Sequence, residues 1–193
     1  LGTLARHARR VREAERNGLP LSGGTHVDVE RAVTEVSIYT PDHPGLFSRI
    51  AGAMALSGAN IVFASICTLH NGMALDTFWI QDEEGAPLSR SERLARLSAR
   101  IEQSVSGRLR PDRDLAGQEK LPSRARVFRV PPRVLIDNNA SATHTVIEVN
   151  GRDRPGFVYD VTRTIAGLGL QINSAKIATY GERAIGVFYV HDA

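Results

Sequence analysis

Two short loops carry the residues that could recognise a charged small molecule. An Asp, a basic residue or His, a Pro and a Gly follow one another at residues 42–45 and again at 153–156. Each loop stands between an alternating, β-branched stretch and an apolar run with helical spacing, so it leads from a strand into a helix. The first backbone N–H groups of a helix have no intrahelical partner and attract anions. Each loop therefore offers N–H groups that could face an anion and an Asp carboxylate that could face a cation.

Both loops supply the same kinds of group. The N–H donors would come from residues 45–47 in the first loop and from residues 156–158 in the second. Glycine after proline lets a ligand approach the backbone closely. Asp42 and Asp153 also have an alternative role, because Asp often caps its own turn or helix in the absence of any ligand. The residue pattern leaves both roles open.

No catalytic constellation accompanies these loops. Asp112 and Asp114 form an Asp-x-Asp pair of the kind that holds metal in nucleotidyltransferases, but they lie in a charged linker without the upstream Gly-Ser partner. His191 and Asp192 have no further His and Asp ligands at a suitable spacing. Cys67 lies inside a predicted strand, which favours a buried thiol over a nucleophile. We therefore expect neither catalytic nor metal-binding residues in this chain.

The two loops belong to a longer internal repeat. The offset between Asp42 and Asp153 is 153 − 42 = 111 residues, and nine positions between residues 42 and 68 meet identical residues at this offset. One residue is then deleted, and the offset becomes 110. The repeated units run over about 34–82 and 144–192. A repeat this long with only two copies indicates a domain duplication, because solenoids need at least about three units.

Each unit predicts a strand, a helix and two further strands. The first unit adds an amphipathic helix at 89–107 and a fourth strand near 127–136. This order is a split βαβ unit with helices on one face of an antiparallel sheet. We therefore predict an α+β fold of two ferredoxin-like βαββαβ units, the second incomplete at its C-terminus. We expect the sheet edge that this leaves open to be covered, for example by a second copy of the chain.

The pattern divides the chain into four segments. Residues 1–33 are predicted to form an N-terminal helix and linker, and residues 34–106 the first unit. Residues 107–143 form a basic linker that includes the fourth strand, and residues 144–193 form the truncated second unit. We expect the linker to be exposed over 107–126. The units should pack through their sheets or through the edges made by the first helix and second strand.

The composition excludes several functional classes. With 42% hydrophobic and 23% charged residues among 193, the chain suits a soluble globular protein. Its net charge of +3 concentrates in residues 1–19 and 107–126 rather than on a folded face with aromatic residues, which argues against nucleic-acid binding. Residues 50–69 carry no charge, but the second copy has Arg163 and Lys176 there, which excludes a membrane segment. The single cysteine fits a reducing compartment.

Longer stretches resemble a known family. Asp-x-Pro-Gly after the first strand and Gly-x-Asn-Ile after the first helix are similar to the ACT domain, a small regulatory module that binds amino acids. Five stretches together resemble the C-terminal tandem ACT region of the bacterial PII uridylyltransferase/uridylyl-removing enzymes: "VTEVSIYTPDHPGLFSRIAGAMALSGANI", "GMALDTFW", "PPRVLIDN", "HTVIEVNGRDRPG" and "IATYGERA". The resemblance covers about residues 34–192. "LARHARRVREAE" also resembles the helix that joins the HD hydrolase domain of that family to the ACT pair.

The resemblance implies a glutamine sensor. In that family, glutamine shifts the parent enzyme from uridylylating the nitrogen-signalling protein PII to removing the uridylyl group. The implied partners are therefore L-glutamine, upstream catalytic domains of the same chain and, through them, PII, with a homodimer also compatible. Neither nucleic acid nor membrane is implied, and the expected location is the cytoplasm. The parent family implies Mg²⁺, but no cofactor is expected in this segment.

The resemblance also implies that an Asn at the start of the second strand reaches the ligand, often across a subunit or domain interface. That residue is Asn60; the second unit has Gln171 at the matching position and Asn173 on the same strand face, so the two sites need not be equivalent. The pocket would join the first loop to Asn60 or to Gln171. Asn60 has the alternative role of capping a loop. The candidate ligand-binding residues are Asp42, His43, Gly45, Leu46, Phe47, Asn60, Ile61, Asp153, Arg154, Gly156, Phe157, Gln171 and Asn173.

Two other functions stay open. The chain could be a module that mediates only dimerisation or interdomain contact, with its loop groups paired internally and no pocket. It could also be an enzyme in its own right, although the absence of a metal or nucleophile constellation in the sequence weighs against this. Finding Asp42 and Asn60 satisfied by neighbouring protein groups would favour the interaction module.

Overall fold

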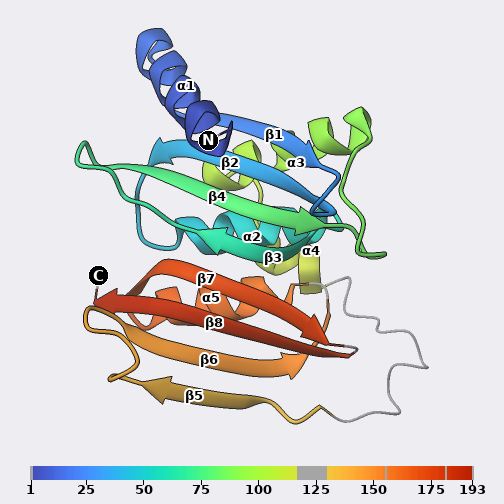
Figure 1. The fold of residues 1–193 in the computed structure, drawn as a ribbon, viewed down its shortest axis with the longest axis vertical. Coiled ribbons are helices and arrows are strands. Elements are labelled where there is room, and N and C mark those ends of the chain that lie inside the picture. Colours follow the sequence, from blue (N-terminus) through green and yellow to red (C-terminus); the bar gives the residue numbers. More distant parts are fainter. Residues whose placement is uncertain (1, 117–129, 155, 181, 193) are drawn as a thin grey trace.

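The computed structural model describes residues 2–116, 130–154, 156–180 and 182–192, and shows an α+β fold built on one long sheet (Figure 1). The helices are α1 (Gly2–Asn17), α2 (Leu46–Leu56), α3 (Ser91–Val105), α4 (Pro111–Ala116) and α5 (Phe157–Gly167). The strands are β1 (Ser22–Asp28), β2 (Val33–Pro41), β3 (Asn60–Ser65), β4 (Met73–Gln81), β5 (Arg133–Asp137), β6 (Thr145–Arg152), β7 (Leu170–Tyr180) and β8 (Arg183–Asp192).

The sheet consists of two halves joined edge to edge. Its strand order is β1-β2-β4-β3-β7-β8-β6-β5, and every neighbouring pair is antiparallel. The second strands of the two units, β3 and β7, form the junction by pairing Phe63 with Lys176, Ala64 with Ala175 and Ser65 with Ser174. In each half, the first strand of the unit (β2 or β6) lies between the third strand (β4 or β8) and an outer strand (β1 or β5), as in a ferredoxin-like sheet. The α+β prediction of two such units is therefore confirmed, and the units meet at their second strands.

The fourth position of each half is filled by a strand that precedes the unit. In the first half this strand is β1, which pairs with β2 and comes from the segment predicted to be helix and linker. In the second half it is β5, which pairs with β6. The prediction of the first unit's fourth strand near 127–136 is therefore wrong: residues 133–136 belong to β5 of the second half, and residues 130–132 form no strand. Residues 127–129 lie outside the described residues. Both strands join their partners through short connections, so a local hairpin supplies the pairing that the distant strand was expected to supply.

Helices cover the two faces of the sheet unequally. α2, α3 and α5 lie on one face, whereas α1 crosses the opposite face over β1 and β2 (Figure 1). β2 is accordingly buried on both faces over eight successive residues. Its Val36 and Ile38 enter the core cluster, while on the other face Glu35 binds Arg6 of α1, Nη2 to Oε1, at 3.0 Å. The helix that resembles a connection to an upstream domain is therefore bound directly to the sheet.

α4 begins in the segment expected to be an exposed linker. Pro111 and Leu115 are buried, and α4 packs against α2. At Gly52 of α2, an added Cβ would lie 2.5 Å from Pro111 and 3.0 Å from the ring of Tyr159 in α5. Glycine therefore lets α2, α4 and α5 approach closely at this point. Pro111 and Leu115 therefore depart from the expected exposed linker, whereas residues 107, 108, 110 and 112–114 are exposed as predicted. Residues 117–126 lie outside the described residues.

Candidate ligand-binding site

Each Asp-x-Pro-Gly loop turns the chain through a glycine in the left-handed region. Gly45 and Gly156 are the N-caps of α2 and α5, with φ of 80° and 81°, a conformation that costs an L side chain about 1–2 kcal/mol. Neither helix has a side-chain cap. The Leu46 N–H donates to the His43 carbonyl, and the Phe157 N–H donates to the Arg154 carbonyl, each at 3.1 Å. These two predicted ligand donors are therefore already used inside the turn.

Each loop faces the second strand of the other unit. The first loop, with Asp42, His43, Leu46 and Phe47, lines a pocket together with Gln171 and Asn173 of β7; we call this the first-loop pocket. The second loop, with Asp153, Arg154 and Phe157, lines a pocket together with Asn60 and Ile61 of β3; we call this the second-loop pocket. Every candidate residue predicted from the sequence thus lines one of the two pockets. Each pocket combines the loop of one unit with the second strand of the other unit.

The crossing follows from the pairing of β3 with β7. Because these strands are antiparallel, the segment after β3 lies beside the start of β7, and the Ile66 N–H donates to the Asn173 carbonyl at 3.0 Å. Gln171 therefore reaches the first loop rather than its own. The helices repeat the exchange, since Thr162 and Ala166 of α5 line the first-loop pocket while Ala51 and Ala55 of α2 line the second.

Asp42 does not cap α2. Its Oδ2 accepts a 2.5 Å hydrogen bond from Thr68 Oγ1, and its N–H donates to the Gly72 carbonyl at 3.0 Å. Asp42 therefore ties the first loop to the segment between β3 and β4, a third role beside ligand binding and helix capping. The carboxylate remains partly exposed at the pocket, so this contact does not exclude a ligand.

Asp76 of β4 also lines the first-loop pocket and was not among the predicted residues. Its exposed fraction is 1%, and its Oδ1 has no hydrogen-bond partner among the described residues. Leaving such an atom unsatisfied costs about 1–3 kcal/mol. Burial first, and then the neighbouring Asp42 carboxylate, raise the pKa of Asp76 to about 8, while a hydrogen bond from the Cys67 backbone lowers it. The sequence signal was a charged residue at an inward position of the alternating "MALDTFWIQ" strand.

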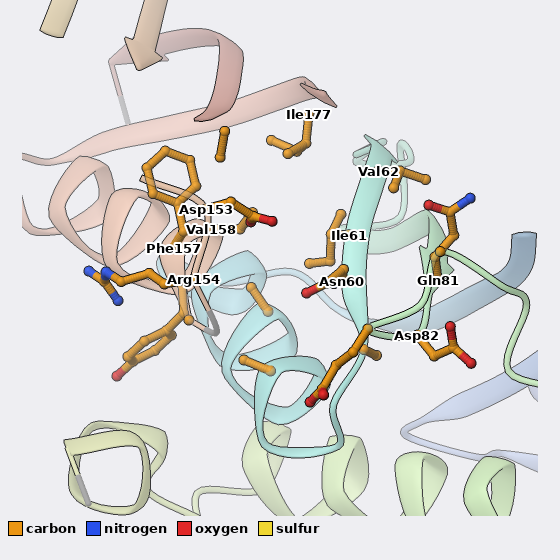
Figure 2. A pocket seen from close by; sticks show the side chains of 18 residues that line it. Asn60, Ile61, Val62, Gln81, Asp82, Asp153, Arg154, Phe157, Val158 and Ile177 are labelled. Atoms are coloured by element: carbon orange, nitrogen blue, oxygen red, sulfur yellow. The ribbon is translucent and has the colours of Figure 1, made fainter. Parts of the chain in front are cut away.

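The second-loop pocket has the larger cavity of the two. Its cavity volume is about 220 Å³, against about 50 Å³ for the first-loop pocket. Figure 2 shows Asp153 and Phe157 on one side of this space and Asn60 and Ile61 on the other. Burial raises the pKa of the half-buried Asp153 carboxyl. The Arg154 guanidinium forms an ion pair with Asp160 of α5, so it is directed in part toward its own helix.

Comparison with known sequences gives the family of both units. The sequence model of the ACT domain matches residues 34–102, and a model described as an ACR9-like, ACT-like domain matches residues 133–192. The chain belongs to the ACT domain family. The second match begins at β5, which agrees with the structural position of this strand in the second ACT unit.

The ACT pair is also similar to part of several larger proteins. Bifunctional uridylyltransferase/uridylyl-removing enzymes of Azospirillum brasilense, Gluconobacter oxydans (strain 621H) and Rhodospirillum rubrum are 60%, 53% and 51% identical to it. Each alignment covers 98% of this chain but only 20–21% of the relative. The chain therefore spans about a fifth of the length of the curated relatives it matches.

The remaining reactive side chains of the ACT pair form no further centre in the part of the chain that the structure describes. No group of three or more His, Cys, Asp or Glu side chains there could hold a metal ion. Cys67 lies after the end of β3 and is exposed, so the expectation of a buried strand thiol is wrong. Among the described residues, no helix is long and apolar enough to cross a membrane.

Proposed function

We propose that this chain is the regulatory ACT pair of a bifunctional uridylyltransferase/uridylyl-removing enzyme and that it binds L-glutamine. Identities of 51–60% over almost the whole chain support the parent enzyme. The observation that carries ligand binding is the crossing of the two loops: each places a carboxylate opposite a side-chain amide from the other unit. A ligand bound in either pocket would contact both units. Its binding would therefore change the relative position of the two halves.

The groups in the pockets match the three ends of glutamine. The ligand ammonium would face Asp42 or Asp153, and its carboxylate would lie at the start of α2 or α5, where the helix dipole favours negative charge. The ligand side chain would meet Gln171 and Asn173, or Asn60. A side-chain amide offers both a donor and an acceptor, so it can pair with another amide in both directions, which a glutamate carboxylate cannot do.

The remaining partners follow from this assignment. The catalytic domains of the parent enzyme would receive the signal, α1 would connect them to the ACT pair, and the PII protein would contact those domains. We place the Mg²⁺ that the parent family implies in the catalytic domains, where the transfer reaction would take place. Such a system would operate in the cytoplasm.

Titration calorimetry with a panel of amino acids tests the proposal. L-Glutamine should give saturable binding heat. L-Glutamate, D-glutamine and L-asparagine should bind at least about tenfold more weakly, since glutamate replaces the side-chain amide and the other two move the ammonium, carboxylate or amide out of place. Binding of glutamate as tight as that of glutamine would contradict the amide pairing. The absence of heat with every amino acid would contradict ligand sensing altogether.

One observation favours an interaction module as the second candidate. β5 is exposed along its whole length, and its Val134, Leu135 and Ile136 are 57%, 43% and 66% exposed. Exposed apolar edge strands commonly pair with another chain. The edge of the second unit, expected to need another cover, is thus occupied by β5, which itself lies open. Light scattering of the Ile136→Lys variant against wild type would show whether this edge holds two copies together.

A further inference from the structure

We infer that the two pockets are unequal, and that the first-loop pocket holds the cationic group of the ligand between the carboxyl groups of Asp42 and Asp76. This inference rests on the proposed amino-acid sensing and assigns the ammonium group to one pocket. It makes Asp76, a residue of the third strand of the unit, a specificity-determining residue of that site.

The position of Asp76 follows from the strand register. Asp76 pairs with Ile38 of β2, and β2 runs on from there into the first loop, which begins at Asp42. Asp76 shares the helix-facing side of β4 with Ala74 and Phe78, both of which have no exposed area. The carboxyl group is therefore set into the core with its open side toward the loop. Its unpartnered Oδ1 marks it as a group whose partner is not supplied by the described protein residues.

The charges around Asp76 favour a cation as that partner. The titratable groups lining the same pocket are Asp42 and His43 of the loop and His191 of β8, while α5 contributes only Thr162 and Ala166. His43 Nδ1 lies 3.1 Å from the Pro44 carbonyl oxygen, and His191 Nδ1 lies 2.8 Å from the Asp192 carbonyl oxygen. No Lys or Arg is among the described residues that line the pocket. A ligand ammonium would therefore supply the positive charge that two adjacent carboxyl groups lack.

The second-loop pocket has no counterpart of Asp76. The matching residue is Gly186, since 76 + 110 = 186. A Cβ added there would lie 2.6 Å from the ring of Phe188 and 3.4 Å from Ile177, so side chains already fill the place of the second carboxyl group. Asp153 of the loop lies opposite Asn60 in that pocket. The other carboxylates of its lining, Asp82 and Glu83, follow the end of β4 and do not occupy the place that corresponds to Asp76. The pseudo-equivalent pockets thus differ in the group that would recognise a cation.

The cavity size agrees with this division. The first-loop cavity of about 50 Å³ can hold a compact ammonium group, and the rest of an amino acid would extend toward solvent past the loop. The second-loop cavity of about 220 Å³ is open to larger groups, and its lining includes a guanidinium group. The two pockets would therefore bind one ligand with different affinities.

Binding in the first-loop pocket would release a proton. With its pKa near 8, Asp76 is about 0.9 protonated at pH 7 without ligand. An ammonium group placed beside it stabilises the ionised form, so the proton passes from the carboxyl group to the buffer while the ligand keeps its own charge. Each binding event at this pocket would then release close to one proton, and affinity would rise about eightfold from pH 6.5 to 7.5.

Calorimetry of L-glutamine binding at pH 7.0 in phosphate and in imidazole buffer measures this proton directly, because the two buffers differ in ionisation enthalpy. Wild type should release about 0.9 proton per ligand at one site. The near-isosteric Asp76→Asn variant should release none and, at pH 8, should bind at least about tenfold more weakly. Asp137→Asn, a change at an exposed Asp of β5 that lines neither pocket, is the control and should leave proton release unchanged.

The outcomes separate this inference from the proposed function. Glutamine binding with the same heat in both buffers would overturn the role of Asp76 and leave glutamine sensing intact. No binding heat with any amino acid would overturn both. If Asp76→Asn does not fold, the comparison of the two buffers on the wild-type chain still decides the question, because it needs no variant.

Discussion

Ala64 of β3 pairs directly with Ala175 of β7, and the two residues hold the same position in their units, since 64 + 111 = 175. Both are completely buried. A pseudo-twofold axis therefore passes between them and relates the two ACT units. Each pocket is formed by the loop of one unit and the second strand of the other unit. Both pockets therefore require the β3–β7 junction in which these two alanines pair.

Enlarging one of these alanines should destabilise the junction. Ala64→Leu adds three carbons to a side chain that is completely buried in the packed junction. Such overpacking typically lowers the free energy of unfolding by about 1–3 kcal/mol. Urea denaturation measures this change. Ala95→Leu, on the exposed side of α3, is the matched control and should change stability by less than about 0.5 kcal/mol. Equal effects of the two substitutions would show that the β3–β7 junction is loosely packed.

Removing the charge of Asp42 should separate ligand binding from folding. Asp42→Asn keeps an acceptor oxygen for Thr68 but loses the charge that would face an ammonium group. We expect glutamine affinity to fall at least about tenfold, or 1.4 kcal/mol, while the melting temperature of the ligand-free chain barely moves. Asp153→Asn should act in the same way if the second-loop pocket also binds.

Calorimetry and thermal unfolding of both single variants and the double variant check this prediction. Unchanged affinity in all three would assign the repeated loop to folding alone. Loss of stability without loss of affinity would assign Asp42 to its Thr68 contact. The control is Asp137→Asn at the exposed last residue of β5. The Asn oxygen can still accept from the N–H groups of Asn139 and Ala140, so this variant should change neither quantity.

Asp76 should make the ligand-free chain less stable as the pH rises. Its folded pKa of about 8 lies above its ordinary value of 3.8, so the folded state binds the proton more tightly than the unfolded state. The stabilisation is complete below about pH 4 and is lost progressively up to about pH 8. Asp76→Asn cannot ionise, so its stability relative to wild type should increase from pH 5 to pH 8. Urea unfolding at both pH values measures the difference, and a constant difference would contradict burial of an ionisable group.

Gly45 should tolerate no side chain without cost. At φ 80° an alanine is strained, so Gly45→Ala should lower the free energy of unfolding by about 1–2 kcal/mol, even though its Cβ would meet only Ser48 Oγ at 3.7 Å. Gly167 is the matched control, because it ends α5 in an ordinary conformation with nothing within 4 Å of an added Cβ. Gly167→Ala should be neutral or stabilising by up to about 1 kcal/mol. A stabilising Gly45→Ala would contradict the left-handed turn.

Local patterns in the sequence were sufficient to predict the repeated unit. Alternation predicted β2 and β6, helical spacing predicted α2 and α5, and the glycines at 45 and 156 marked the turns between them. These features depend on residues close together in the chain, whose backbone preferences act without the rest of the fold. The loop candidates could be named for the same reason, since the repeat itself pointed to both loops, whereas Asn60 and Gln171 were named from the resemblance to ACT domains.

The pairing of distant segments could not be read in this way. The sequence left open whether Asn60 or Gln171 would lie beside the first loop, and the contact of β3 with β7 decided in favour of Gln171. β1, with its two glycines, has too weak an alternation to be recognised as an edge strand until β2 pairs with it. The alternation of β4 places Asp76 at an inward position, but its nearly complete burial comes from the loop and helices packed over it, which the alternation does not predict. Such choices depend on the free energy of bringing remote surfaces together, which local residue patterns do not encode.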